Sequence, residues 1–179
     1  ETDTAHSGDP DGLERGLAIH LMLDRLSRAG DTDHHQLLTT LAGALGRNLS
    51  DPELQDWWDE ACQVYNSPRL AHLFDKHCFE KAWNEVPLQY LSGTRMVYGI
   101  IDRLVLGKDS VLLIDYKTHR SATAETLGEL ARAYTKQIQL YANGAALLWP
   151  DLKIDAFLLF TSCNKLVPMD TETGTPQEL

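Results

Sequence analysis

The sequence predicts a mixed α/β (α+β) domain, in which helices flank a central mixed β-sheet and an extra helical region comes first. Apolar residues recur with a helical period over roughly residues 13–75, whereas residues 79–116 change to three strand-like runs rich in Val, Ile, Leu and aromatic residues. A further helix and strand follow, an order that builds a mixed sheet. The chain has 179 residues, 43% of them hydrophobic, enough for one domain with a sizeable core.

In the first region, helices are expected over residues 13–28, 34–46, 52–65 and 68–74. Gly30 follows the first of them, where a glycine ends a helix. The third begins most clearly, because Ser50 is placed to cap it, Pro52 to open its first turn and Glu53 to complete a Ser-x-x-Glu capping box.

In the second region, strands are expected over residues 79–90, 96–106, 111–116, 154–161 and 165–168. Gly93 separates the first two strands, and Gly107-Lys108-Asp109-Ser110 separates the second from the third; both compositions are typical of hairpin turns. Before the fourth strand, one long helix is expected from about Ala124 to Leu148, and Pro150 stops it.

The expected organisation is one domain over residues 13–168, mainly helical over 13–75 and holding the sheet core and the long helix over 76–168. A flexible entry segment (1–12) and a flexible tail (169–179) flank it. No apolar run approaches the ~18 residues that span a membrane, and the polar, acidic first residues are unlike a signal peptide. The sequence lacks an initiator Met, so we expect a piece of a longer protein.

Cysteine usage and charge narrow the functional classes. Cys62, Cys78 and Cys163 lie far apart and form no CxxC pair, which argues against a zinc or iron–sulfur site and against a disulfide framework, and favours a reducing, cytoplasmic setting. The net charge of −10 argues against broad electrostatic binding of nucleic acid by this segment alone. An acidic balance is compatible with a nuclease that collects its metal ions on carboxylates.

Two acidic residues on neighbouring strands are the most informative feature. If the hairpin turns at Lys108-Asp109, Leu106 faces Val111 and, four residues further along, Asp102 faces Asp115. Directly opposed residues have Cβ atoms about 4.5–5.5 Å apart. Because side chains alternate along a strand, Lys117 shares the face of Asp115. One local hairpin therefore gathers two carboxylates and an amine.

Carboxylates so close together repel, and the pKa of one of them rises unless positive charge lies between them. Lys117 supplies one charge and a divalent cation would supply more; oxygen ligands favour a hard ion such as Mg²⁺ or Mn²⁺. From the residues alone an alternative stays open, a structural ion pair of Lys117 with Asp102 or Asp115 at the margin of the sheet.

These residues resemble the motifs of the PD-(D/E)XK nuclease superfamily, and specifically of the RecB/AddA-type nuclease domain fused to UvrD-like DNA helicases. Four motifs occur in the family's order: Arg15-Gly16-x-x-x-His20, Gly-x-x-Asp102-Arg, Asp115-Tyr116-Lys117 and Tyr134-x-x-Gln137-x-x-x-Tyr141. The resemblance covers roughly Leu13 to Pro168 and implies a restriction-endonuclease-like core.

The resemblance also implies roles. It makes His20, Asp102, Asp115 and the backbone carbonyl of Tyr116 the ligands of one or two Mg²⁺ ions, with Mn²⁺ as a substitute. It makes Lys117 the group that orients the attacking water and stabilises the transition state. On the same basis Gln137 is catalytic, and Tyr134 and Tyr141 contact DNA.

Each outer residue also has a plainer interpretation. His20 shares a helical stripe with Leu13 and Leu17 that is expected to point inward, where a histidine is often a core residue. The two tyrosines fit a core as well, with Gln137 on the surface. Glu85, in a Glu-x-Pro stretch, also resembles the family, but a charged strand end is its default role.

The expected function is Mg²⁺-dependent cleavage of single-stranded DNA by a helicase–nuclease that processes double-strand breaks for recombinational repair. The implied partners are single-stranded DNA, helicase domains upstream in the same full-length chain and a second helicase–nuclease subunit, with no membrane. ATP binding is not encoded here, since no G-x-x-x-x-G-K-[ST] motif occurs. Two alternatives remain: a catalytically inactive nuclease-fold module that binds DNA ends or a partner subunit, or an unrelated soluble domain with a structural ion pair.

Overall fold

The computed structural model describes residues 10–30 and 33–171. Its elements are α1 (Pro10–Ala29), α2 (His34–Leu45), α3 (Pro52–Tyr65), the 3₁₀ turn η1 (Pro68–Leu70), α4 (Ala71–Phe74), β1 (Lys81–Ser92), β2 (Arg95–Leu106), β3 (Ser110–Lys117), α5 (Leu127–Arg132), α6 (Thr135–Leu148), β4 (Lys153–Phe160), the 3₁₀ turn η2 (Thr161–Cys163) and β5 (Lys165–Met169). Among these described residues, none of the helices combines the length and the apolarity that crossing a bilayer requires.

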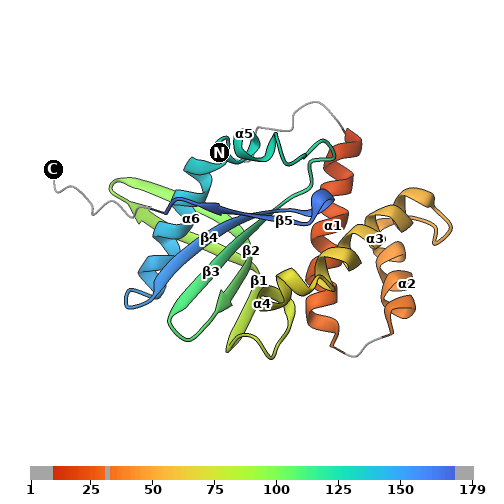
Figure 1. Ribbon diagram of the computed structural model, residues 1–179, viewed down its shortest axis with the longest axis horizontal. Helices are drawn as coiled ribbons and strands as arrows, with labels where there is room; N and C mark the ends of the chain where they lie inside the picture. Colours follow the sequence, from red (N-terminus) through yellow and green to blue (C-terminus); the bar gives the residue numbers. More distant parts are fainter. Residues whose placement is uncertain (1–9, 31–32, 172–179) are drawn as a thin grey trace.

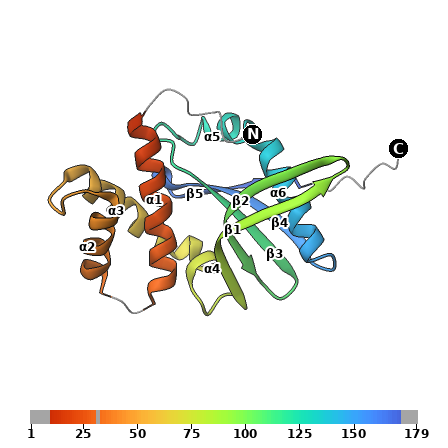
Figure 2. The same cartoon turned by 180° about the vertical axis from the view of Figure 1, so that it is seen from behind.

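The five strands form one mixed sheet in the order β1-β2-β3-β4-β5. β3 and β4 are parallel, and the other neighbouring pairs are antiparallel. Because parallel neighbours need a crossover connection, α5 and α6 lie between β3 and β4 in the chain. Helices α1 to α4 gather on one side of the molecule and α6 lies on the other (Figure 1, Figure 2).

Each face of the sheet has its own hydrophobic core. Ile114 and Tyr116 belong to the core under α1–α4, whereas Leu113 belongs to the core under α6. β3 is therefore buried on both faces, as its apolar run predicted. The predicted mixed α/β class, with a central sheet flanked by helices and a helical region in front, is confirmed.

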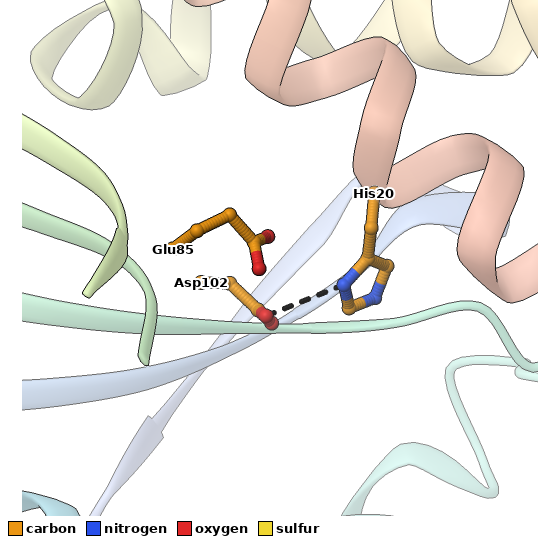
Figure 3. Close-up of side chains that lie close together, drawn as sticks. All are labelled: His20, Glu85 and Asp102. Carbon is orange, nitrogen blue, oxygen red and sulfur yellow. Dashed lines mark ion pairs between the residues drawn. The ribbon is translucent and has the colours of Figure 1, made fainter. Parts of the chain in front are cut away.

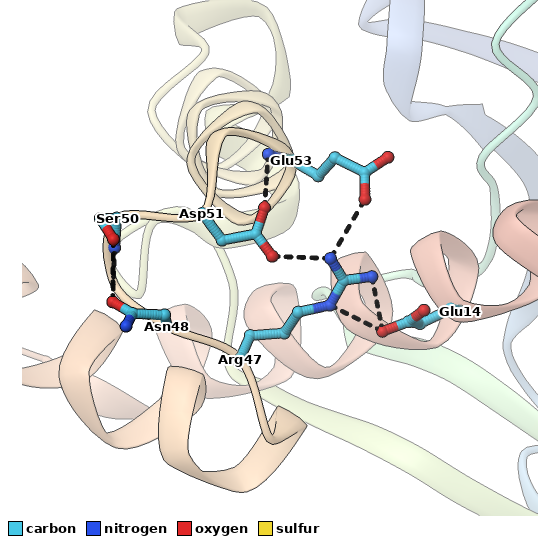
Figure 4. Close-up of polar contacts among 6 residues, drawn as sticks. All are labelled: Glu14, Arg47, Asn48, Ser50, Asp51 and Glu53. Atoms are coloured by element: carbon cyan, nitrogen blue, oxygen red, sulfur yellow. Dashed lines mark hydrogen bonds and ion pairs between the residues drawn. The ribbon is translucent and has the colours of Figure 1, made fainter.

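The start of α3 differs from the prediction. The capping box at Ser50 is wrong, because Asp51 is the N-cap residue and its carboxylate accepts a hydrogen bond from the Glu53 N–H at 3.0 Å (Figure 4). Pro52 occupies the first helical turn, so the residue directly before it takes the cap position. The Ser50 hydroxyl bonds to Asn48 instead, at 3.0 Å.

The single long helix expected over residues 124–148 is also wrong. The chain turns between α5 and α6, where Tyr134 adopts φ −101° and ψ −1° and its ring is buried. That ring lies against Lys117, and its hydroxyl is 2.8 Å from His119 Nε2. Contacts with distant residues outweigh the helical pattern at this point.

The expected flexible ends fall largely outside the described residues. Within the expected entry segment (1–12), α1 already begins at Pro10. Within the expected tail (169–179), β5 continues to Met169. The described helix and strand thus extend slightly beyond residues 13–168 at both ends.

Two glycines in helices provide a matched test of the packing. A Cβ at Gly144 of α6 would come within 2.5 Å of the Leu88 Cδ1, whereas a Cβ at Gly43 of α2 would meet nothing within 4 Å. Gly144→Ala should destabilise the domain by about 1–2 kcal/mol, because overpacking outweighs the gain in helix propensity. Gly43→Ala should stabilise it by roughly 0.5–1 kcal/mol. Urea unfolding measures both, and equal signs for the two variants would contradict the α6–β1 packing.

Candidate active site

The predicted register of the β2–β3 hairpin is confirmed from Leu106↔Val111 to Arg103↔Ile114. The ladder ends there, so the predicted direct pairing of Asp102 with Asp115 is wrong. In place of a ladder bond, the Tyr116 N–H donates to the Asp102 Oδ2 at 2.6 Å. The Asp102 carboxylate therefore fills the fork where β2 leaves β3, and we call this place the fork.

The alternation of side chains slips at the fork. Ile101 and Leu104 would point to opposite faces of a regular strand, yet both belong to the core under α6. The slip lies at Asp102 on β2, and on β1 at the opposite position, Glu85, which has a left-handed φ of +50°. As a result, both carboxylates turn towards α1 (Figure 3).

On α1, His20 completes a cluster with these two carboxylates. One ligand atom from each of His20, Glu85 and Asp102 lies within 4.8 Å of the others, an arrangement that suits a metal ion (Figure 3). The His20 Nδ1 is 3.3 Å from the Asp102 Oδ1. Burial lowers the pKa of His20, but the nearby carboxylates, Asp102 foremost, together outweigh burial and leave that pKa above its ordinary value.

His20 reaches the cluster from a different stripe of α1 than the sequence suggested. Leu13 and Leu17 are 58% and 64% exposed, so their predicted inward stripe is wrong; the buried stripe runs through Ile19 and Met22 instead. His20 lies at the margin of that buried stripe, with its ring edge-on to Tyr116 at a centroid distance of 5.5 Å. A marginal position leaves its nitrogen atoms free to face the fork.

A second group of residues surrounds Lys117. Its Nζ lies 2.9 Å from the Asp115 Oδ2, and both residues are buried, with 6% and 4% exposure. The same amine is 3.4 Å from the Gln137 Oε1 and 3.7 Å from the centroid of the Tyr134 ring. The Gln137 amide in turn donates to the Tyr141 hydroxyl at 3.2 Å. The downstream motif thus encloses the lysine.

Tyr134 and Tyr141 are both buried in the core under α6. Their packing agrees with the plainer interpretation of these rings as core residues. Their contact with DNA stays a prediction, as does the role of the Tyr116 carbonyl.

The surroundings of Asp115 carry more negative than positive charge. Burial, followed by the nearby Asp102 carboxylate, raises the pKa of Asp115 to about 6 despite the opposing effect of Lys117. Its buried Oδ2 accepts no well-aligned hydrogen bond from the described residues and is held by the ion pair with Lys117. Partial desolvation and Asp102 also raise the pKa of Glu85. A divalent cation would offset this negative potential, so the residues present fit one.

Glu85 is the residue whose role the sequence analysis left open, with a charged strand end as its default. A signal existed, because the turn at Gly93 pairs Ser92 with Arg95. Counting back along both strands from this pair sets Glu85 opposite Asp102.

The chain belongs to the PD-(D/E)XK nuclease superfamily, whose family model matches residues 3–177. The mixed sheet flanked by helices is the restriction-endonuclease-like fold of that superfamily.

Among curated proteins, the chain is 24% identical over 164 residues to an ATP-dependent helicase/nuclease subunit from Streptococcus mutans, covering 88% of this chain and 13% of that protein. It is 25% identical over 169 residues to the protein of the same name from Carboxydothermus hydrogenoformans, covering 88% of this chain and 14% of that protein. The chain therefore spans only a small part of the length of these relatives. A crystal structure of a Vibrio cholerae protein shares 14% identity over 89% of this chain and 44% of its own, with a TM-score of 0.33, too distant to define the fold by itself.

The buried Asp115–Lys117 pair predicts that removing the lysine amine lowers the free energy of unfolding by an amount that depends on pH. Lys117→Met leaves Asp115 buried without its counter-charge, which should cost about 3–5 kcal/mol at about pH 8. Without Lys117 the pKa of Asp115 in the folded protein rises above 6, further above that of the unfolded chain, so folding favours the protonated form. The free energy of unfolding of the Lys117→Met variant is therefore higher at low pH and falls as the pH rises. The loss of stability relative to the wild type should be smaller at about pH 5 than at about pH 8.

Urea unfolding of the metal-free protein at both pH values measures this difference. The double variant Lys117→Met/Asp115→Asn is the control, because it removes both charges and should show little of the pH dependence. A Lys117→Met cost that is equal at both pH values would show that the two groups are not coupled.

Proposed function

We propose that this domain hydrolyses phosphodiester bonds of single-stranded DNA with the help of Mg²⁺, as the nuclease part of a longer helicase–nuclease. The observation that carries the proposal is the juxtaposition at the fork: a His–Glu–Asp cluster on one side of the Tyr116 backbone and a buried Asp–Lys pair on the other. Membership of a nuclease superfamily supports it.

In this proposal His20, Glu85 and Asp102 would hold one cation, and Asp115 with the Tyr116 carbonyl would complete its ligand set or hold a second ion. When bound, Mg²⁺ would supply Lewis-acid stabilisation of the charge on a scissile phosphate and acidify an attacking water. Asp102 has a special position, because its Oδ2 is fixed by the Tyr116 N–H while its Oδ1 faces His20.

The chain's own residues then orient and stabilise. The Lys117 amine is fixed between Asp115, Gln137 and the face of the Tyr134 ring. A fixed positive charge costs no reorganisation when negative charge develops on the phosphate, so Lys117 is the electrostatic catalyst. Gln137 holds Lys117 and orients the attacking water, and Tyr134 and Tyr141 border the DNA strand from the side of α6.

The wider setting rests on the relatives. Both are named as subunits of an ATP-dependent helicase/nuclease, which supports helicase domains in the full-length protein and a further protein chain in the complex. We extend the proposal to a cytoplasmic location and to double-strand-break processing for recombination. These parts rest on the cysteine usage and the family resemblance of the sequence, not on the relatives' names. The competing function is an inactive module that binds DNA ends or a partner subunit. The presence of Asp102, Asp115 and Lys117 together argues against it.

A cleavage assay tests the proposal directly. The wild-type domain should degrade end-labelled single-stranded DNA with Mg²⁺ and not with EDTA. Lys117→Met, checked for folding by circular dichroism, should reduce the rate by about 10²–10³-fold, the typical effect of losing one electrostatic group. Lys153→Met is the matched control, because Lys153 is exposed and forms an ion pair with Asp155, away from the fork. Undiminished cleavage by Lys117→Met would refute the assigned role.

Metal binding is measured separately, by calorimetry with Mn²⁺ and by thermal unfolding. A cation at a hundredfold excess over its Kd should stabilise the fold by about 2.7 kcal/mol. Asp102→Asn and Glu85→Gln should both weaken binding, because each removes a carboxylate of the cluster. Asp155→Asn, a carboxylate on β4 that pairs with Lys153, should leave it unchanged. Equal affinity in all three variants would place the cation elsewhere.

A further inference from the structure

The first two residues of the Arg-Gly-x-x-x-His motif take no part in the proposed chemistry, yet both lie against Thr118, the residue that follows β3. Arg15 is almost wholly buried, an unusual place for a guanidinium. Its Nη1 donates to the carbonyl oxygen of Thr118, and its Nη2 pairs with the Glu60 Oε2 of α3. Thr118 directly follows Lys117, so Arg15 binds the backbone at the end of the strand that carries the lysine.

Gly16 brings α1 close to the same residue. A Cβ at this position would lie 3.2 Å from the Thr118 Oγ1, nearer than a methyl group packs without displacing its neighbour. His20 is four residues further along α1, hence on the same side of the helix one turn on. The approach at Gly16 thus sets the distance from which His20 faces Asp102.

The energetics of the buried Arg15–Glu60 ion pair favour a role in fixing the position of α1 over a role in stabilising the fold. A buried ion pair contributes little net stability, because desolvation of both charges offsets their attraction. Within the described part of the chain, the second oxygen of Glu60 is also buried without a hydrogen-bond partner. An apolar residue would pack there at less cost, but it would not bind a carbonyl at one fixed place.

We propose that Arg15 and Gly16, through Thr118 and Glu60, form a positioning clamp that fixes His20 relative to Asp102 and sets the His20 side of the site in register with the Lys117 side. The functional consequence of this inference rests on the proposed function, whereas the contacts of Arg15 and Gly16 do not depend on it. Neither residue touches the cluster itself, so both are positioning residues.

The chain offers a matched control for the clamp. Arg47 also binds α1, through Glu14 next to Arg15, and pairs with Asp51 and Glu53 as well (Figure 4). It thus anchors the helix to the α2–α3 connection and not to β3. Arg15→Met and Arg47→Met both remove an ion-paired arginine from the surroundings of α1, but only the first releases Thr118.

The metal-free protein gives the first measurement. Arg15→Met should shift the imidazole NMR signals of His20 towards those of a histidine without the Asp102 contact, and Arg47→Met should leave them in place. Gly16→Ala should shift them too, and Gly16→Ala/Thr118→Ala should restore them because the hydroxyl in the way is gone. Unchanged His20 signals in folded Arg15→Met and Gly16→Ala would overturn the clamp.

A double-mutant cycle in Mn²⁺ affinity gives the second measurement. Arg15→Met should weaken binding by about tenfold, the usual effect of losing a residue that orients a ligand. In a His20→Ala background the same change should cost less than about twofold, because there is no ligand left to position. A full tenfold loss in that background would refute positioning through His20. If wild-type protein binds no Mn²⁺, the proposed metal site fails, while the NMR signals still decide the clamp.

Discussion

The hydrogen bond from the Tyr116 N–H to the Asp102 carboxylate is the interaction on which the candidate site depends. A central strand needs partners for its backbone groups on both sides, and β3 loses its β2 neighbour one pair early. The carboxylate replaces the missing strand at 2.6 Å. This substitution satisfies a buried N–H and at the same time fixes an acidic group in the plane of the sheet, reachable from α1 and adjacent to Asp115.

The charges around the fork do not balance. Asp102, Asp115 and Glu85 meet Lys117 and a histidine, and the raised pKa values of Asp115 and Glu85 reflect the excess of negative charge. Asp102 and Asp115 are buried, and in such a low-dielectric setting an excess of negative charge is costly unless a cation offsets it. The arrangement differs from a structural ion pair, since Lys117 and Asp115 alone would balance without the two further carboxylates. The net charge of −10, which argued against DNA binding, thus has a local counterpart in the excess of carboxylates at the fork.

Much of this geometry was readable from the sequence where local rules dominate. The hairpin register followed from the turn at Lys108-Asp109 and the apolar run after it, and the central place of β3 from that same run. Other features depend on distant contacts and could not be read. No proline or glycine marks the break at Tyr134, whose ring is held by Lys117 and His119. The paired slip at Glu85 and Asp102 has no periodic signal, and it alone turns both carboxylates towards His20.

The topology explains why two segments so far apart in sequence meet at the fork. The parallel pair of β3 and β4 forces the chain to leave the carboxyl end of β3 and return over one face of the sheet, so the crossover begins next to Lys117. The first turn of α6 therefore arrives beside the lysine and presents Gln137 to it. The opposite face is left to α1, which brings His20. Ligand sites in open α/β sheets lie at the carboxyl ends of strands for this reason, and here the antiparallel β2 adds its own carboxylate to the same end.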